Sequence, residues 1–142
     1  MRGPVISKVP GLLEYLAQTQ RSIDKVLVIF DADRRKPDEL EREFKRRISK
    51  DYSFQVIPII VVEELEAWLI ADPAALRNLL GKSRDFKNPE KIRHPKAELQ
   101  KLLSRTTRYT PEVARRLAQS LDLKMLERRC SSFREFQRAL ES

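Results

Sequence analysis

The chain has 142 residues, a mass of 16.7 kDa and a net charge of +8, which suits one soluble domain with its own hydrophobic core. Its three glycines are too few for an all-β sandwich or barrel, and the longest apolar run, Val56–Val62, is far shorter than the roughly 20 residues of a membrane helix. The single cysteine, Cys130, excludes an internal disulfide. We expect no signal peptide and no membrane partner, so the expected location is the cytoplasm.

The first half of the chain predicts alternating helices and strands. Leu40, Phe44 and Ile48 recur at a spacing of four and predict a helical face directed toward the core. Pro10 suits the start of a helix, and Pro58 favours an edge position for the strand that contains it. The expected elements are a helix over 10–20, a buried strand over 25–30, a helix over 38–48 and a buried strand over 54–62.

The second half predicts helices separated by short loops. Gly81 closes a helix that starts at Pro73, Thr110 caps a later one, and residues 132–135 read as a capping box, Ser-Phe-Arg-Glu, for the last. The expected segments are helices over 63–71, 73–80, 95–103 and from 110, a polar loop or single turn over 82–93, a connection or short turn over 121–125 and a helix over 132–140.

These elements predict an α/β fold in which a small parallel sheet is flanked by helices and followed by a helical C-terminal half. A strand, a helix and a strand in this order favour a right-handed βαβ unit. We expect one domain over residues 1–142, with a βαβ-type core over 1–81 and a basic helical extension over 82–142.

Acidic residues follow both predicted strands. Asp31 and Asp33 come directly after the first, and Glu63, Glu64 and Glu66 come after the second. The carboxyl ends of parallel strands meet at one edge of a sheet, where ligands of α/β folds gather. If a helix starts there, Glu63 and Glu66 share one of its faces. Clustered carboxylates without histidine or thiolate suit Mg²⁺ or Mn²⁺.

Structural explanations of the same acids stay open. An Asp-x-Asp after a strand often caps the next helix, and acids at a helix N-terminus are favoured by the helix dipole. The repulsion among them requires a compensating charge. That charge is either a metal ion or one of the neighbouring basic residues Arg34, Arg35 and Lys36.

The basic excess lies toward the C-terminus. Residues 93–142 carry 12 basic and 6 acidic side chains, against 17 and 15 in residues 1–92. Such a surface attracts nucleic acid through phosphate contacts, or it serves only as a solvated helical surface. The residues we expect to contact nucleic acid are Arg34, Arg35, Lys36, Arg115 and Arg116.

Several segments together resemble a known family. They are VLVIFDAD (26–33), VVEELEAWLIADPAAL (61–76), YTPEVARRL (109–117) and CSSFREFQRAL (130–140), and they are similar to DUF4276, a family of Toprim-like proteins. The resemblance covers nearly the whole chain. It implies a Toprim-type site in which Asp31 and Asp33 supply the Asp-x-Asp and Glu64 and Glu66 the acids before the tryptophan, with Mg²⁺ used for phosphodiester cleavage or joining.

The start of the chain departs from the Toprim pattern. Members begin with a strand that carries a glutamate in an E-G-x-[TS]-[DE]-like turn, whereas the sequence MRGPVISKVPGLLEYL has no such glutamate, so we expect an N-terminally shortened form. Three hypotheses follow: a metal-dependent phosphodiesterase acting on nucleic acid, a non-catalytic nucleic-acid-binding module, and an interaction subunit that forms a homodimer or needs a protein partner.

Overall fold

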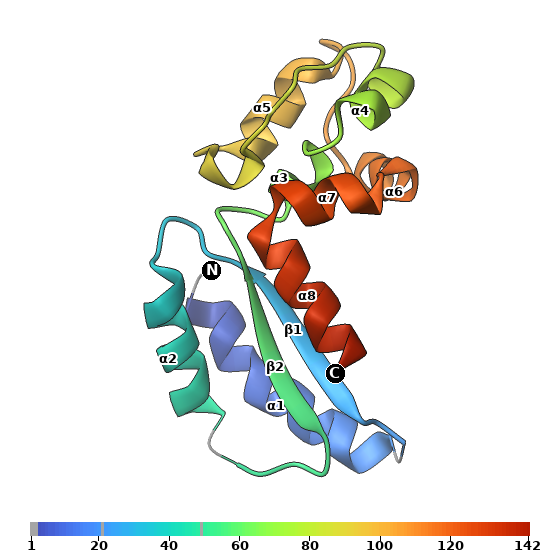
Figure 1. The fold of residues 1–142 in the computed structure, drawn as a ribbon. Helices are drawn as coiled ribbons and strands as arrows, with labels where there is room; N and C mark the ends of the chain where they lie inside the picture. Colours follow the sequence, from blue (N-terminus) through green and yellow to red (C-terminus); the bar gives the residue numbers. More distant parts are fainter. Residues whose placement is uncertain (1–2, 21, 49) are drawn as a thin grey trace.

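A pair of parallel strands forms the centre of the computed structural model, which describes residues 3–20, 22–48 and 50–142 (Figure 1). Strands β1 (Lys25–Asp31) and β2 (Gln55–Val61) pair along their whole length, with Lys25 opposite Gln55 and Asp31 opposite Val61. Helix α2 (Pro37–Arg47) connects them. The predicted parallel pair is therefore confirmed, and Pro58 lies in an edge strand because the described part of the sheet has two strands.

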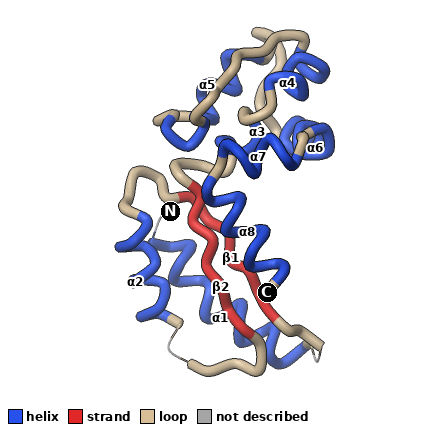
Figure 2. Tube along the Cα trace, viewed as in Figure 1, coloured by secondary structure: helices blue, strands red, loops and turns tan. Residues whose placement is uncertain are grey.

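Helices cover both faces of the sheet. Helices α1 (Gly3–Thr19) and α2 lie on one face, and α8 (Ser131–Glu141) lies on the other (Figures 1 and 2). Phe30 and Ile60, which are opposite each other in the register, belong to the core that the first face shares with α1 and α2. Val61 belongs instead to a core with Phe133 of α8. The result is a three-layer helix–sheet–helix arrangement.

Helix α1 begins earlier than predicted. The sequence placed its start at Pro10, but the helix runs from Gly3 and contains Pro10 in its interior. Ile6, Val9 and Leu13 are buried at helical spacing on the side that faces the sheet. Their burial offsets the backbone hydrogen bond that an internal proline removes.

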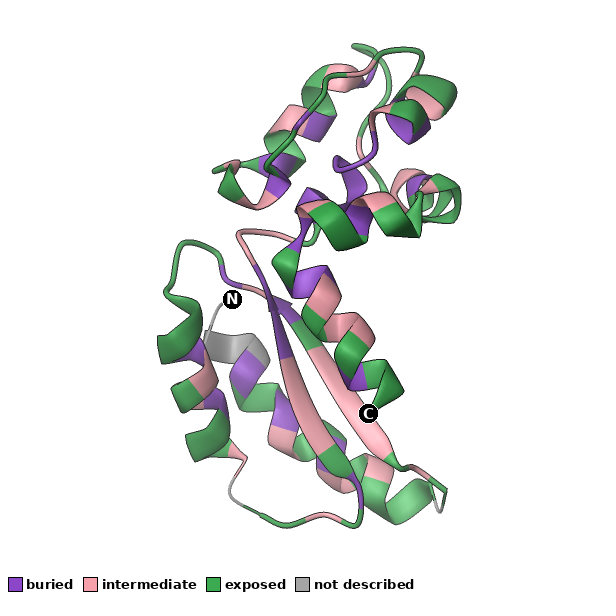
Figure 3. Ribbon diagram, in the orientation of Figure 1, coloured by how far each residue is buried: buried purple, intermediate pink, exposed green. Residues whose placement is uncertain are grey.

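A helical unit lies beyond the carboxyl ends of the strands, and Figure 3 shows its buried residues gathered on the inward sides of its helices. Leu76, Leu99 and Leu117 are fully buried there. Its elements are α3 (Glu66–Leu69), α4 (Pro73–Leu80), the 3-10 turn η1 (Pro89–Lys91), α5 (Pro95–Leu102), α6 (Pro111–Ser120) and α7 (Leu123–Arg129).

The predicted helix start at Pro73, the helix end at Gly81 and the cap at Thr110 are confirmed. The Asp72 carboxylate accepts hydrogen bonds from the amides of Ala74 and Ala75 at the start of α4, and Gly81 ends that helix with a φ of 76°. The Thr110 hydroxyl accepts from the Val113 amide at the start of α6.

Three expectations were wrong. Helix α3 begins at Glu66 rather than at residue 63, and α7 occupies most of the segment expected as a connection. The predicted capping box does not form, because α8 begins at Ser131 and the Ser132 hydroxyl bonds to Trp68 and Glu90 instead of its own helix.

The overall class, α/β with a small parallel sheet and a helical C-terminal half, agrees with the prediction. The division of the chain near residue 81 stays a prediction, and the structure adds that α8 packs on the sheet. Among the described residues, none of the helices has the length and apolar character needed to span a bilayer.

Candidate functional site

The candidate site lies where both strands end and the helical unit begins. Backbone hydrogen bonds extend the strand pairing past the sheet, from the Ala32 amide to the Val61 carbonyl (2.8 Å) and from the Asp33 amide to the Glu63 carbonyl (2.9 Å). These bonds hold the loop after β1 beside the loop after β2. Residues that follow the two strands are therefore brought together, as predicted.

Asp31, the last residue of β1, points its carboxylate at the loop after β2. Its Oδ1 accepts a hydrogen bond from the Leu65 amide at 2.7 Å. Burial raises the pKa of Asp31, the Leu65 hydrogen bond opposes that rise, and the negative charges of Glu66 and Glu64 add to it. Asp31, Glu64 and Glu66 thus form one electrostatically coupled group, which we call the acidic cluster.

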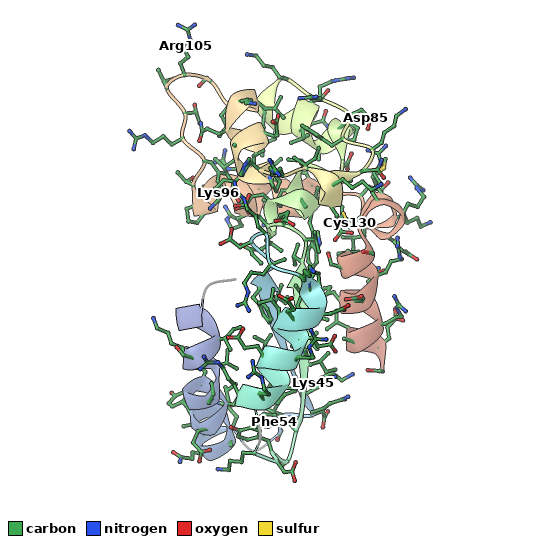
Figure 4. The ribbon with its side chains drawn as sticks, turned by 90° about the vertical axis from the view of Figure 1, so that its left-hand side faces the viewer. Lys45, Phe54, Asp85, Lys96, Arg105 and Cys130 are labelled. Atoms are coloured by element: carbon green, nitrogen blue, oxygen red, sulfur yellow. The ribbon has the colours of Figure 1, made fainter. Side chains whose placement is uncertain are left out.

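Lys96 and Tyr109 from the helical unit compensate the acidic cluster. The Lys96 ammonium is 3.8 Å from Oε1 of the buried Glu66, and the Lys96 amide donates to Glu64 Oε1 at 3.2 Å. Burial, the charge of Glu66 and a hydrogen bond to its carboxylate raise the pKa of Tyr109, so its hydroxyl stays protonated as a donor. Figure 4 shows Lys96 between the helical unit and the ends of the strands.

A pocket of about 400 Å³ opens beside the acidic cluster. Its walls combine one carboxylate with cationic and hydrogen-bonding groups, a set suited to a charged, polar ligand. The residues that line it are Glu64, His94, Lys96, Ala97, Gln100 and Tyr109.

The loop after β1 has an unusual backbone. Asp33 and Arg34 adopt φ values of 49° and 70°, a left-handed conformation that non-glycine residues rarely take. Asp33 is exposed, whereas Asp31 is half-buried, and the acids that raise the Asp31 pKa are Glu66 and Glu64. The structure therefore brings Asp31 to the acids after β2 but gives Asp33 a different environment.

Glu63 also leaves the acidic cluster. Because α3 begins at Glu66, the expected helical face shared by Glu63 and Glu66 does not exist. Glu63 lines a second pocket of about 410 Å³ together with Arg34, Glu90, Lys91 and Arg93. Its buried Oε2 accepts no hydrogen bond from any described residue.

The donors of the acidic cluster match the oxygen ligands that Mg²⁺ and Mn²⁺ take. In the hydrogen bonds described above, Asp31 and Glu64 each use one carboxylate oxygen, which leaves the other for a cation. Within the described ranges, no three acidic, histidine or cysteine side chains are close enough together to hold an ion. The donor chemistry fits such an ion, but its binding would require both displacement of the Lys96 ammonium and a closer approach of the three carboxylates.

The expected nucleic-acid contacts have different environments. Arg34 bonds to His94 Nε2 at 2.9 Å beside the pocket, and Lys36 is exposed before α2. Arg35 pairs with Glu43 at 2.8 Å. Arg115 and Arg116 both pair with Glu112, at 2.6 and 3.1 Å, within α6.

Sequence reasoning did not identify Lys96, Tyr109 and His94 as site residues. His94 and Lys96 flank Pro95 at the start of α5, and Tyr109 lies in the loop before α6. Their only local signal is a helix start, and nothing in the spacing indicates that α5 begins over the strand ends. The contact between Arg34 and His94 spans 60 positions of sequence.

Conspicuous residues of the motifs 61–76 and 130–140 have structural roles. The Trp68 indole donates to the Ser132 hydroxyl at 2.9 Å and packs edge-on against Phe133. Asp72 accepts from the Asp122 amide besides capping α4. Cys130 is fully buried, which raises its pKa to about 12 and keeps the thiol protonated and unreactive.

Comparison with known proteins identifies a family. The comparisons with curated proteins and with solved structures found no match. The family DUF4276, a domain of unknown function, matches residues 6–141, which include both strands, the acidic cluster and every described helix beyond the first turns of α1. The chain therefore belongs to the DUF4276 family.

Proposed function

We propose that this chain is a Toprim-type, divalent-cation-dependent phosphodiesterase that acts on nucleic acid. The observation that carries the proposal is the convergence of Asp31, Glu64 and Glu66 from the ends of two parallel strands beside a pocket that Lys96 lines. Repulsion within such a group is unfavourable for stability, and unfavourable charge clusters are concentrated at functional sites. A hard cation is the ligand that best reduces the repulsion among these carboxylates.

In this proposal Asp31, Glu64 and Glu66 hold the cation, and Asp33 and Glu63 stand beside it as further acidic residues. Mg²⁺ or Mn²⁺ held there would supply charge neutralisation at a phosphate and a more acidic bound water. Lys96 moves from Glu66 toward the phosphate, and Tyr109 keeps its proton as a donor in the pocket.

Cleavage of labelled single-stranded DNA and RNA with and without Mg²⁺ or Mn²⁺ tests this proposal. We expect Asp31→Asn and Glu64→Gln to reduce metal-dependent cleavage by at least about 100-fold, since each removes a charged ligand. Asp51→Asn, an exposed aspartate at the opposite end of β2, is the matched control and should cleave normally. Equal cleavage by Asp31→Asn and Asp51→Asn would contradict the proposal.

A non-catalytic nucleic-acid-binding module is the second candidate. It is favoured by the Lys96 contacts, because an internal ammonium already compensates Glu66 without a metal ion. This candidate expects nucleic-acid binding that falls steeply with salt and survives chelation, together with no cleavage under any metal condition.

A further inference from the structure

A second group of cations lies next to the acidic cluster. Arg34 from the loop after β1 and Lys91 and Arg93 from the segment before α5 line one pocket of about 410 Å³. We call these three residues the basic strip. All three are exposed.

The charges of the basic strip are not compensated within the described structure. Lys91 and Arg93 form no ion pair with a described residue. Some other surface arginines do have carboxylate partners, as Arg35 has Glu43 and Arg129 has Asp85. Unpaired, solvent-accessible cations gathered in one pocket are a typical binding site for an anion.

The two carboxylates in this pocket do not neutralise the strip. Glu90 accepts hydrogen bonds from the amides and hydroxyls of Ser131 and Ser132, so its charge is directed at the start of α8. Glu63 has no ion pair with a described residue.

The strip and the acidic cluster are joined by one contact. The Arg34 guanidinium donates to His94 Nε2 at 2.9 Å, and His94 lines the pocket beside the acidic cluster. A ligand in the strip therefore lies directly beside a ligand at the acidic cluster. An extended chain with repeated anionic groups fits this arrangement better than an isolated anion does.

We propose that the basic strip binds a nucleic-acid backbone phosphate next to the phosphate that the acidic cluster receives. The choice of ligand rests on the function proposed above. Guanidinium groups suit phosphate because they donate paired hydrogen bonds. The proposal assigns backbone binding to Arg34, Lys91 and Arg93, and it removes this role from Arg115 and Arg116, whose charges are paired with Glu112.

Binding of a fluorescein-labelled 20-nucleotide single-stranded DNA of mixed sequence, followed by anisotropy in EDTA, tests the proposal. The variant is Lys91→Gln/Arg93→Gln, and the matched control is Arg115→Gln/Arg116→Gln, which removes the same two charges. We expect the strip variant to bind the DNA at least about 10-fold more weakly than the wild type. The slope of the logarithm of the binding constant against the logarithm of the salt concentration should also be smaller in magnitude by about 1.4, since two phosphate contacts are lost. The control should bind nearly as the wild type does. Thermal unfolding by circular dichroism checks that both variants are folded.

Equal weakening in the two variants would overturn the proposal, since total charge rather than the strip would then govern binding. Unchanged binding by the strip variant, or no binding by the wild type, would overturn it as well. EDTA separates this test from the test of cleavage: the strip binds without metal ions even if the acidic cluster catalyses nothing. Cleavage that is lost in Asp31→Asn but unaffected in the strip variant would leave the proposed function standing and remove the strip.

Discussion

The ionisation of Asp31 links the acidic cluster to the stability of the fold. Burial and the charges of Glu66 and Glu64 raise its pKa, so the folded chain holds the Asp31 proton more tightly than the unfolded chain does. The stabilising contribution of the bound proton is present at acid pH and is lost as the pH rises through the folded pKa. At neutral pH the ionised carboxylate therefore opposes folding.

We predict that Asp31→Asn raises the Tm at pH 7 and that the gain shrinks at pH 4, because the wild-type carboxyl is protonated to a greater extent at the lower pH. The amide oxygen still accepts from the Leu65 amide, so the hydrogen bond is kept. Thermal unfolding at both pH values is the measurement, with Asp51→Asn as the control. A lower Tm for Asp31→Asn at pH 7 would show that the cluster is not strained by its charges.

Arg34 stores backbone strain in the loop after β1. Its φ of 70° is unfavourable for a residue with a Cβ atom, by about 1–2 kcal/mol. We predict that Arg34→Gly raises the free energy of unfolding by roughly 0.5–1 kcal/mol, since glycine relieves the strain but is more flexible when unfolded. Urea unfolding measures the change. Lys36→Gly, at a φ of −71°, is the control and should lower stability.

Helix caps can be predicted from the sequence more readily than residues with a left-handed backbone. Thr110 was predicted as a cap because a cap is decided by residues two or three positions away. The left-handed conformation of Asp33 and Arg34 was not predicted, because glycine is the usual signal for positive φ and this loop has none. Their conformation depends on the backbone bonds between the two strand ends.

At the scale of elements, α8 depends on a residue of another segment. Its expected cap, Ser132, is used by Trp68 and Glu90, and the Glu90 carboxylate accepts hydrogen bonds from the first amides of the helix. Sequence reasoning found a capping box because the spacing of Ser132 and Glu135 fits one. It could not detect a carboxylate more than 40 positions away that accepts from the amides of Ser131 and Ser132.

We predict that Glu90→Ala lowers the free energy of unfolding by about 2–3 kcal/mol, because it leaves the first amides of α8 without an acceptor in a part-buried place. Glu127→Ala, an exposed glutamate of α7, is the matched control and should change stability by less than about 0.5 kcal/mol. Urea unfolding of both variants decides the matter. A similar small loss in both would mean that Glu90 does not hold α8 in place.

At the scale of the whole molecule, the sequence predicted the parallel pair and the gathering of acids at its end. The apolar runs of β1 and β2 and the helix between them are local patterns with one common solution. The return of α8 to the sheet and the position of α5 over the strand ends come from long-range packing. For that reason the sequence predicts Asp31, Glu64 and Glu66 as site residues, whereas only the structure shows that Lys96 and Tyr109 lie beside them.

The central claim is that the acidic cluster is a cation site completed by displacement of Lys96. Calorimetric titration of Mg²⁺ and Mn²⁺ into the wild type, Asp31→Asn and Asp51→Asn tests it most directly. We predict saturable binding by the wild type and by Asp51→Asn, and its loss in Asp31→Asn. Heats that are the same in all three proteins, or an absence of binding in the wild type, would contradict the claim and leave Lys96 as the permanent counter-ion of the cluster.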